Sequence, residues 1–328
     1  MKSLAVYYNT TVKYGFKMEL MSAFAKPIEE SGIRVRHFKG PEGFEVADDF
    51  SHAIIFNYQR VKQNQEELKA RLQLRVNVWN KYKESGKIWM FDNDVLNGVD
   101  AHLNHNYHYD MKNSYVRVAY GNIYPGKAKY FNDNCPRDRW DLMAKIKRIK
   151  VQEYDLRKGE FIYICCNRGS SGYSGLGVNA SQWAIETADE LRKHTDRPII
   201  IRQHSSRSYE EHKTDFKRLT EYCETADKVS VESPLGEYPG LVGQIKRAYA
   251  VVIFTSTAGG PAIVEGKPLF ICNKHCYYLP MNAGRLSDIE KPNISMDRQQ
   301  FLNNLGYSHW RLPDLKSGEY WERVKDVI

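Results

Sequence analysis

The sequence is poor in the features that mark membrane, secreted and fibrous proteins. Its longest purely apolar run, at 248–254, has seven residues, whereas a membrane-spanning helix needs about 20. The first residues contain neither a long apolar stretch nor the small-residue cleavage site of a signal peptide. Six unevenly spaced cysteines among 328 residues favour reduced thiols over a disulfide framework. These absences predict a cytoplasmic protein without a membrane span.

What is present is the composition of a globular protein. Hydrophobic residues make up 42% of the chain and charged residues 27%, which is ordinary for a folded domain. A typical domain has roughly 100–200 residues, so the length predicts two domains, each with a core of its own.

The excess of positive charge is confined to the first half of the chain. Residues 1–150 contain 25 Lys and Arg against 17 Asp and Glu, whereas residues 151–328 contain 23 of each. A basic segment beside a neutral one is typical of a protein that binds a polyanion. The same excess also serves solubility, and charge alone leaves both interpretations open.

Hydrophobic patterning predicts strands that alternate with helices along both halves of the chain. In the first half, strands are expected at 4–8, 33–38, 52–56 and 88–91, with helices at 16–28 and 65–84. In the second half, strands are expected at 161–165, 198–202, 229–231, 250–254 and 268–272, with helices at 181–194, 209–225, 241–248 and 262–265. A helical tail is expected from about residue 296, carrying Trp310 and Trp321.

This alternation predicts an α/β protein with two Rossmann-like domains that face each other across a cleft. We expect the domains at 1–155 and 156–328, the second with the helical tail. Parallel sheets of this kind bind ligands beyond the carboxyl ends of their strands. Functional residues are therefore expected in the loops that follow strands.

A loop rich in glycine and serine follows the strand at 161–165. Arg168, Gly169 and Ser170 open it, and such a loop before a helix can hold a phosphate on its backbone amides. It lacks the Gly-Lys-Ser/Thr ending of a P-loop. The alternative is a surface loop without a ligand.

A second small-residue loop follows the most apolar strand. Ser256, Thr257, Ala258, Gly259 and Gly260 supply hydroxyls and amides suited to a diphosphate. The alternative is a helix start built of small residues that binds nothing.

Charged side chains also end two of the expected strands. Arg202 and His204 lie two residues apart and so point to one side of an extended chain; a ligand contact and a structural ion pair are both open. Asp92 and Asp94 follow the strand at 88–91. Either carboxylate could be a general base, although Asp is also frequent in turns.

The stretch from Ser256 to Pro268 resembles the donor domain of GT-B glycosyltransferases: a small-residue loop, a helix, Gly-Lys-Pro and a strand. The tail around Trp310, Gly318 and Trp321 is similar to that of capsule-type sugar transferases. The resemblance implies a nucleotide-sugar donor, a UDP-sugar, held by the second domain. No Asp-x-Asp loop follows a strand of that domain, so the sequence does not require a metal. Related chains carry Glu-Ala where this one has Pro261-Ala262, so Glu265 would contact the ribose instead.

The stretch from Lys81 to Asp94 is similar to DNA glucosyltransferases of T-even phages, in which a lysine-rich helix end, a strand and a catalytic Asp follow one another. This resemblance implies transfer of a hexose or pentose to a hydroxymethylated pyrimidine, such as hydroxymethylcytosine, in double-stranded DNA. The basic first domain would bind the DNA, Asp94 would be the base, and a monomer would work in the host cytoplasm if a bacteriophage encodes it. Alternatives are a polysaccharide or lipid-linked acceptor, a sugar-nucleotide epimerase, and a non-enzymatic nucleic-acid-binding protein.

Overall fold

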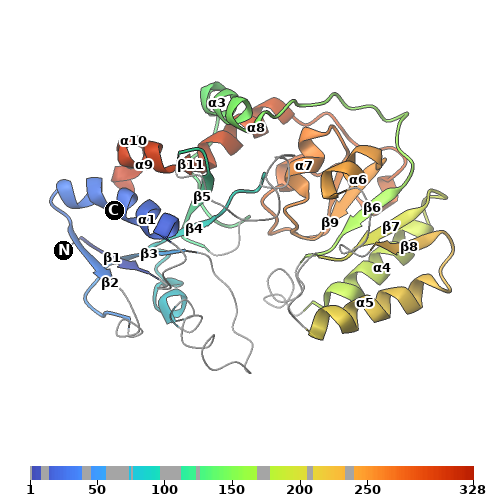
Figure 1. Cartoon of the computed structure of the whole chain (residues 1–328), viewed down its shortest axis with the longest axis horizontal. Helices are drawn as coiled ribbons and strands as arrows, with labels where there is room; N and C mark the ends of the chain where they lie inside the picture. Colours follow the sequence, from blue (N-terminus) through green and yellow to red (C-terminus); the bar gives the residue numbers. More distant parts are fainter. Residues whose placement is uncertain are drawn as a thin grey trace. The chain divides into compact units, whose positions relative to one another are not determined.

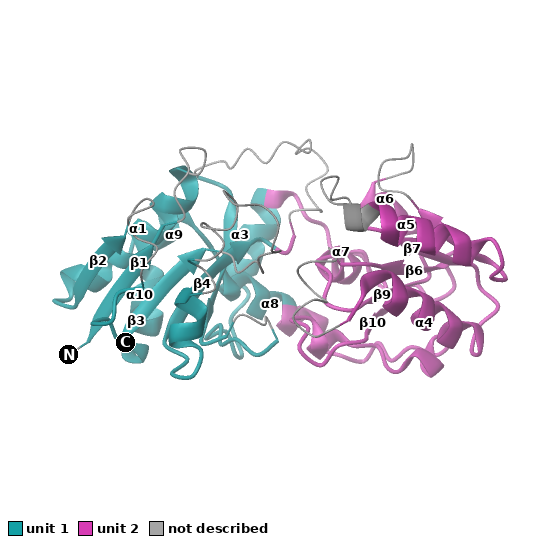
Figure 2. Ribbon diagram, turned by 90° about the horizontal axis from the view of Figure 1, so that it is seen from below, with its two compact units in different colours: residues 1–94, 102–146, 302–328 teal, residues 95–101, 147–301 magenta. Residues whose placement is uncertain are grey.

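The computed structural model divides the chain into two compact units (Figures 1 and 2). Unit 1 comprises residues 1–94, 102–146 and 302–328, and unit 2 comprises residues 95–101 and 147–301. Within these ranges the structure describes residues 2–8, 15–38, 46–56, 74, 77–96, 112–122, 126–167, 178–204, 210–232 and 240–328. The sequence-based boundary assigned the last residues to the second domain, whereas here residues 302–328 pack with the first.

Unit 1 is built on a mixed sheet with the strand order β11-β5-β4-β3-β1-β2. Its strands are β1 (Ser3–Tyr7), β2 (Arg34–Phe38), β3 (His52–Phe56), β4 (Ile88–Asn93), β5 (Tyr115–Tyr120) and β11 (His309–Arg311). The four strands predicted from the sequence are parallel to one another, whereas β5 is antiparallel to β4 and β11 is antiparallel to β5. Those two antiparallel strands were not predicted.

A large hydrophobic cluster of unit 1 lies on one face of this sheet. Helix α1 (Gly15–Glu30) buries Phe16, Leu20, Phe24 and Ile28 against it, because residues four apart share one face of a helix. The helix ends where Gly32 adopts a φ of 86°, which a residue with a Cβ rarely adopts. Helices α9 (Leu312–Lys316) and α10 (Glu319–Val324) add Leu315 and Tyr320 to the same core.

The expected helical tail is wrong in its middle, where α8 (Arg298–Ser308) gives way to β11. Trp310 therefore lies on a strand, fully buried, rather than on a helix. Pro313 stands in the first turn of α9, where its missing N–H costs no hydrogen bond. Arg139 of α3 (Asp138–Lys147) stacks over the Trp310 ring at 3.7 Å and donates to the carboxylates of Asp314 and Glu319.

Unit 2 contains a parallel sheet with the strand order β10-β9-β6-β7-β8. The strands are β6 (Ile162–Cys165), β7 (Ile199–Arg202), β8 (Val229–Glu232), β9 (Ala250–Ile253) and β10 (Leu269–Ile271). Helices α4 (Ala180–Arg192) and α5 (Glu210–Cys223) cover one face, and α6 (Leu241–Arg247) and α7 (Gly259–Val264) cover the other (Figure 1). Numbered along the chain, this order is 5-4-1-2-3, the arrangement of a Rossmann fold. The prediction of an α/β chain with two Rossmann-like domains is confirmed.

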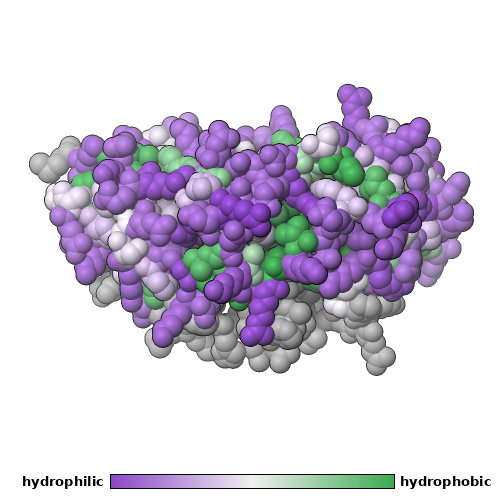
Figure 3. Space-filling view, turned by 90° about the horizontal axis from the view of Figure 1, so that it is seen from above, coloured by the Kyte–Doolittle hydropathy of each residue, from purple (hydrophilic) through white to green (hydrophobic). Residues whose placement is uncertain are grey.

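Polar side chains cover most of the described surface in the view of Figure 3. Leu142 and Leu279 are the large hydrophobic residues that the described part of the chain exposes, at 38% and 41%. No helix in the described ranges is long and apolar enough to cross a membrane.

Candidate functional site

The strand order of unit 2 predicts where a ligand binds. The chain runs from β6 outward through β7 to β8 and then returns to place β9 on the other side of β6. The direction in which the chain adds strands therefore reverses between β6 and β9, which makes the carboxyl ends of these two strands the switch point of the sheet. This switch point is the position at which open α/β sheets bind nucleotides.

Two side chains join the loops at this switch point. The amide of Asn167, two residues after β6, donates from Nδ2 to Thr255 Oγ1 over 3.0 Å, and the Thr255 N–H donates back to Asn167 Oδ1 over 3.1 Å. The pair fixes the distance between Asn167 and Thr255 and holds the Thr255 hydroxyl beyond the carboxyl end of β9. Asn167 was not singled out from the sequence, although a polar residue directly after a buried strand was a usable signal.

The small-residue loop after β9 differs in one respect from the predicted diphosphate cradle. The N–H of Gly259 donates to the carbonyl of Ser256 over 3.2 Å, and that of Gly260 donates to Thr257 over 3.1 Å. Ser256 and Ala258 are buried, whereas Thr257 is exposed. Hydroxyl groups of threonine, rather than the two glycine amides, are thus what this loop offers to a ligand.

Packing explains why two glycines stand at the start of α7. A Cβ on Gly259 would lie 2.6 Å from the ring of Tyr278, and one on Gly260 would lie 2.7 Å from the carbonyl oxygen of Val95. Both distances are shorter than a Cβ atom tolerates. The paired glycines therefore have a structural reason that requires no ligand.

Glu265, the predicted ribose contact, lies at the far end of α7. A helix of this length spans about 9 Å, so the carboxylate is separated by that length from the loop after β9. Its Oε1 lies 3.8 Å from Lys246 Nζ, and burial raises the pKa of Glu265. The contact with ribose remains a prediction.

Arg202 is engaged within unit 2 at the carboxyl end of β7. Its Nη1 donates to Glu232 Oε1 over 2.7 Å and to the Tyr163 hydroxyl over 3.0 Å, and that hydroxyl donates to Glu232 Oε2 over 2.8 Å. Burial raises the pKa of Tyr163, which keeps the hydroxyl a donor. Of the two interpretations of Arg202, the structure shows the ion pair. His204 lies half-buried two residues further on, and Arg168, Gly169 and Ser170 lie outside the described residues.

In unit 1, the two candidate carboxylates at the end of β4 differ in environment. The Asp92 side chain is 36% exposed, and its Oδ2 accepts a hydrogen bond of 2.6 Å from Arg117 Nη2 on β5. The Asp94 side chain is fully buried, and its Oδ1 lies 3.6 Å from Nε2 of His309 on β11. Sequence reasoning missed His309, because only the pairing of β11 with β5, two strands remote in the sequence, brings it here.

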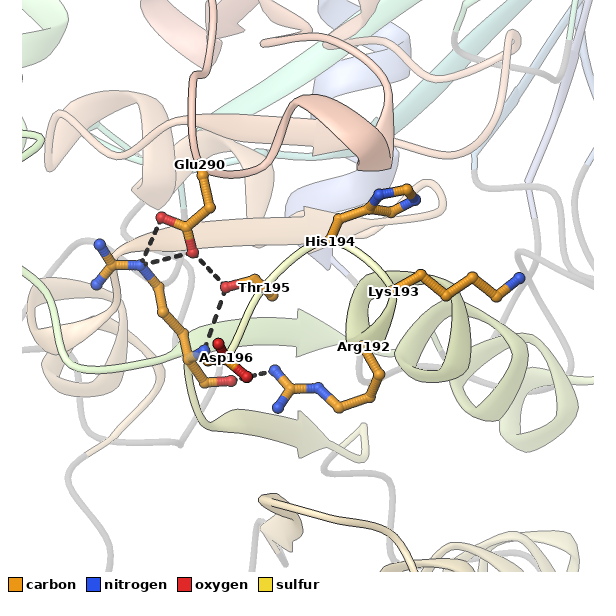
Figure 4. A pocket seen from close by; sticks show the side chains of 7 residues that line it. Arg192, Lys193, His194, Thr195, Asp196 and Glu290 are labelled. Carbon is orange, nitrogen blue, oxygen red and sulfur yellow. Dashed lines mark hydrogen bonds and ion pairs between the residues drawn. The ribbon is translucent and has the colours of Figure 1, made fainter.

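A cavity of about 590 Å³ in unit 2 lies elsewhere (Figure 4). It is lined by the turn between α4 and β7, which leads into the amino end of β7, opposite the switch point. Several of its charged side chains are paired: Arg197 Nε lies 3.2 Å from Glu290, and both Lys193 and His194 contact Glu190. We therefore do not assign the nucleotide to this cavity.

No protein-family model matches the sequence, and no curated protein matches it. Within the described ranges, no group of three or more His, Cys, Asp and Glu could hold a metal ion.

Among solved structures, the chain is similar to KpsC of Thermosulfurimonas dismutans, a beta Kdo 2,7 transferase, with 11% identity, coverage of 92% of this chain and 89% of that one, and a TM-score of 0.49. It is also similar to the UDP-GlcNAc 2-epimerase of Methanocaldococcus jannaschii in complex with UDP-GlcNAc and UDP, with 11% identity, full coverage of both chains and a TM-score of 0.36. A third is S. aureus MnaA with UDP, at 9% identity, 99% and 98% coverage and a TM-score of 0.32. The fold assignment itself rests on the strand order of the two units.

Proposed function

We propose that the chain is a glycosyltransferase that takes a nucleotide-sugar donor at the switch point of unit 2 and activates an acceptor hydroxyl with a carboxylate of unit 1. The observation that carries this proposal is the Asn167–Thr255 pair, which joins the loops after β6 and β9 where a Rossmann-type sheet binds nucleotides.

In this proposal the donor is a UDP-sugar whose diphosphate lies against the loop after β9. Thr255 and the exposed Thr257 donate hydroxyl hydrogen bonds to phosphate oxygens. Negative charge grows on the diphosphate as it leaves, so donors fixed in advance lower the barrier more than mobile ones. Arg168, which follows Asn167 directly in the sequence, is our candidate for the cation that neutralises this charge.

The acceptor proposal rests on unit 1. Asp94 takes the proton from the acceptor hydroxyl, and Asp92, held by Arg117, lies on the solvent side of it. The Asp94 side chain is 0% exposed, so the acceptor must displace what covers it. The basic charge of residues 1–150 supports DNA as the acceptor, with a hydroxymethylated pyrimidine turned out of the stack to reach Asp94.

The test begins with donor binding, measured by calorimetry with UDP and with UDP-sugars. We expect Thr255→Val and Asn167→Ala to weaken UDP binding about tenfold or more, since each loses a hydrogen bond at the site. Thr225→Val is the matched control, because the Thr225 hydroxyl bonds only the Tyr222 carbonyl near the end of α5. Equal affinity in all variants would contradict the proposed donor site.

The second step uses radiolabelled UDP-sugars with DNA that contains hydroxymethylcytosine or hydroxymethyluracil. Label that enters modified DNA, is absent from unmodified DNA and is lost in Asp94→Asn would support the full proposal. Donor hydrolysis without transfer would contradict the DNA acceptor and would direct the search to glycan or lipid-linked acceptors.

A further inference from the structure

Strands β4, β5 and β11 align polar side chains in one row across the sheet of unit 1. Asp92 is paired in register with Arg117, and Arg117 is paired with His309. Because alternate residues of a strand share a face, Asp94 lies on the same face as Asp92. The opposite face carries the core residues Val116 and Trp310. The C-terminal tail thus contributes its histidine to the face of the sheet that carries both candidate carboxylates.

Both ring nitrogens of His309 have partners. Nδ1 lies 2.9 Å from the carbonyl oxygen of Leu305 and 2.8 Å from Ser308 Oγ, and the Ser308 hydroxyl itself donates to Leu305. A carbonyl oxygen only accepts, so Nδ1 carries a proton. Nε2 faces Asp94 Oδ1 at 3.6 Å, and both side chains are 0% exposed. Nε2 is thus the ring nitrogen that faces the candidate base.

The other charged groups around this pair are matched among themselves. Arg117 binds Asp92, Arg311 binds Asp314, and Arg139 binds Asp314 and Glu319 while its Nη2 donates to the main-chain oxygen of His309. Among the ion pairs of the described residues, the one that reaches Asp94 is that with His309, which is cationic when Nε2 carries a proton. A carboxylate removed from water without such a partner favours its protonated form, which cannot accept a proton.

We propose that His309 is a positioning residue that, as an imidazolium, holds Asp94 ionised and oriented for proton abstraction. This inference rests on the proposed function and names a residue of the same site. In the step, the acceptor O–H proton passes to the second carboxylate oxygen of Asp94 while the acceptor oxygen bonds to the anomeric carbon. The bond from that carbon to the diphosphate breaks, and its electron pair leaves with the nucleotide. His309 keeps both of its N–H protons.

The first experiment compares pH–rate profiles of the full-length wild type, His309→Gln and a control. We expect His309→Gln to lower kcat about 100-fold, in the range of a general base, and to move the acidic limb of the profile upward by about one pH unit. The KM for the donor should stay within twofold, because the donor lies in unit 2. His194→Gln is the matched control, since His194 also pairs with a carboxylate, Glu190 at 2.9 Å, away from the site. A loss of kcat with the acidic limb unmoved would mean a merely structural role and would overturn the proposal.

The second experiment needs no activity. NMR of protein with ¹⁵N-labelled histidine reads the protonation of each imidazole against pH, and the His309 signal is identified by its loss in His309→Gln. We expect the midpoint at which His309 loses its proton to fall by one pH unit or more in Asp94→Asn, because the carboxylate charge is gone. An unchanged midpoint would overturn the proposed pair. Absence of donor binding in the wild type would instead contradict the proposed function, and the NMR result would still decide on the pair.

Discussion

His52, at the start of β3, is a buried titratable residue whose charge state couples to folding. Its side chain contacts Ser51 Oγ over 2.9 Å, and the residue is 4% exposed. Burial lowers its pKa to about 4, and the neighbouring Lys87 and Lys2 act in the same direction. The folded protein thus holds a neutral imidazole over a pH range in which the unfolded chain is protonated.

From this we predict that the protein loses stability as the pH falls from about 6.5 towards 4. In that window the unfolded state binds a proton that the folded state does not, so the free energy of unfolding decreases with falling pH. At pH 5 the loss from this residue is about 2 kcal/mol relative to pH 8. Denaturant unfolding at a series of pH values measures it. His52→Gln should flatten the pH dependence by that amount; equal slopes for wild type and His52→Gln would contradict the prediction.

At the scale of elements, the short strand β11 is held in place by Arg139 of α3. The guanidinium is 6% exposed, stacks on Trp310, and bonds Asp314 at 3.1 Å and Glu319 at 2.6 Å. One side chain thus ties together α3, β11, α9 and α10, which come from two distant parts of the chain.

We predict that Arg139→Leu destabilises the protein by about 3 kcal/mol, because it removes one of the two guanidinium partners of the buried Asp314 together with the stacking on Trp310. Arg137→Leu, two residues earlier, removes only an exposed pair with Asp141 in the same helix, and it should cost less than about 0.5 kcal/mol. Urea unfolding of both variants beside the wild type measures the difference. Similar losses in the two variants would show that the Arg139 contacts contribute nothing beyond those of a surface pair.

The elements that could be predicted from the sequence are those whose signal is local. Strands such as β3 and β9 are continuous apolar runs, and α1 repeats its apolar residues every turn. Strand β11 has three residues, and its identity depends on pairing with β5, which no local pattern encodes. Helix α7 begins three residues before the predicted start, because a Gly-Gly-Pro stretch is typical of a loop unless packing against Tyr278 selects the helix.

For the candidate site, as for the fold, the sequence indicated residues with a local signal and missed partners from distant parts of the chain. The rule that ligands bind after strands found Asp92, Asp94 and the loop after β9 without knowledge of the fold. The partners that give these residues their properties, Arg117, His309 and Asn167, were missed because they lie on other strands or loops. The engagement of Arg202 with Glu232 was likewise open until β7 and β8 were seen to be neighbours.

At the scale of the whole molecule, the uneven charge makes a prediction about DNA. If residues 1–150, with 25 Lys and Arg against 17 Asp and Glu, bind the phosphates of duplex DNA, the affinity must depend steeply on salt because bound cations are released. For about four phosphate contacts, affinity should fall about 100-fold between 50 and 200 mM salt. Fluorescence anisotropy with unmodified duplex DNA measures this slope, and UDP binding at the same salt concentrations is the control. No binding at 50 mM salt, or a flat salt dependence, would contradict DNA as the acceptor. Neither result would contradict the proposed donor site in unit 2.

The return of the chain to unit 1 has a consequence for its synthesis. β5 pairs with β11, which follows it by roughly 190 residues, and the ribosome makes about 5–20 residues per second. During roughly 10–40 s the nascent chain therefore presents β5 as an unpaired edge, a known hazard for aggregation. Unit 2, which is complete at residue 301, can fold in that interval, whereas the first half of the chain must wait for the last. Unit 1 thus becomes complete only after unit 2, although its first strands are made earlier, and a nascent chain that ends before β11 exposes the edge of β5.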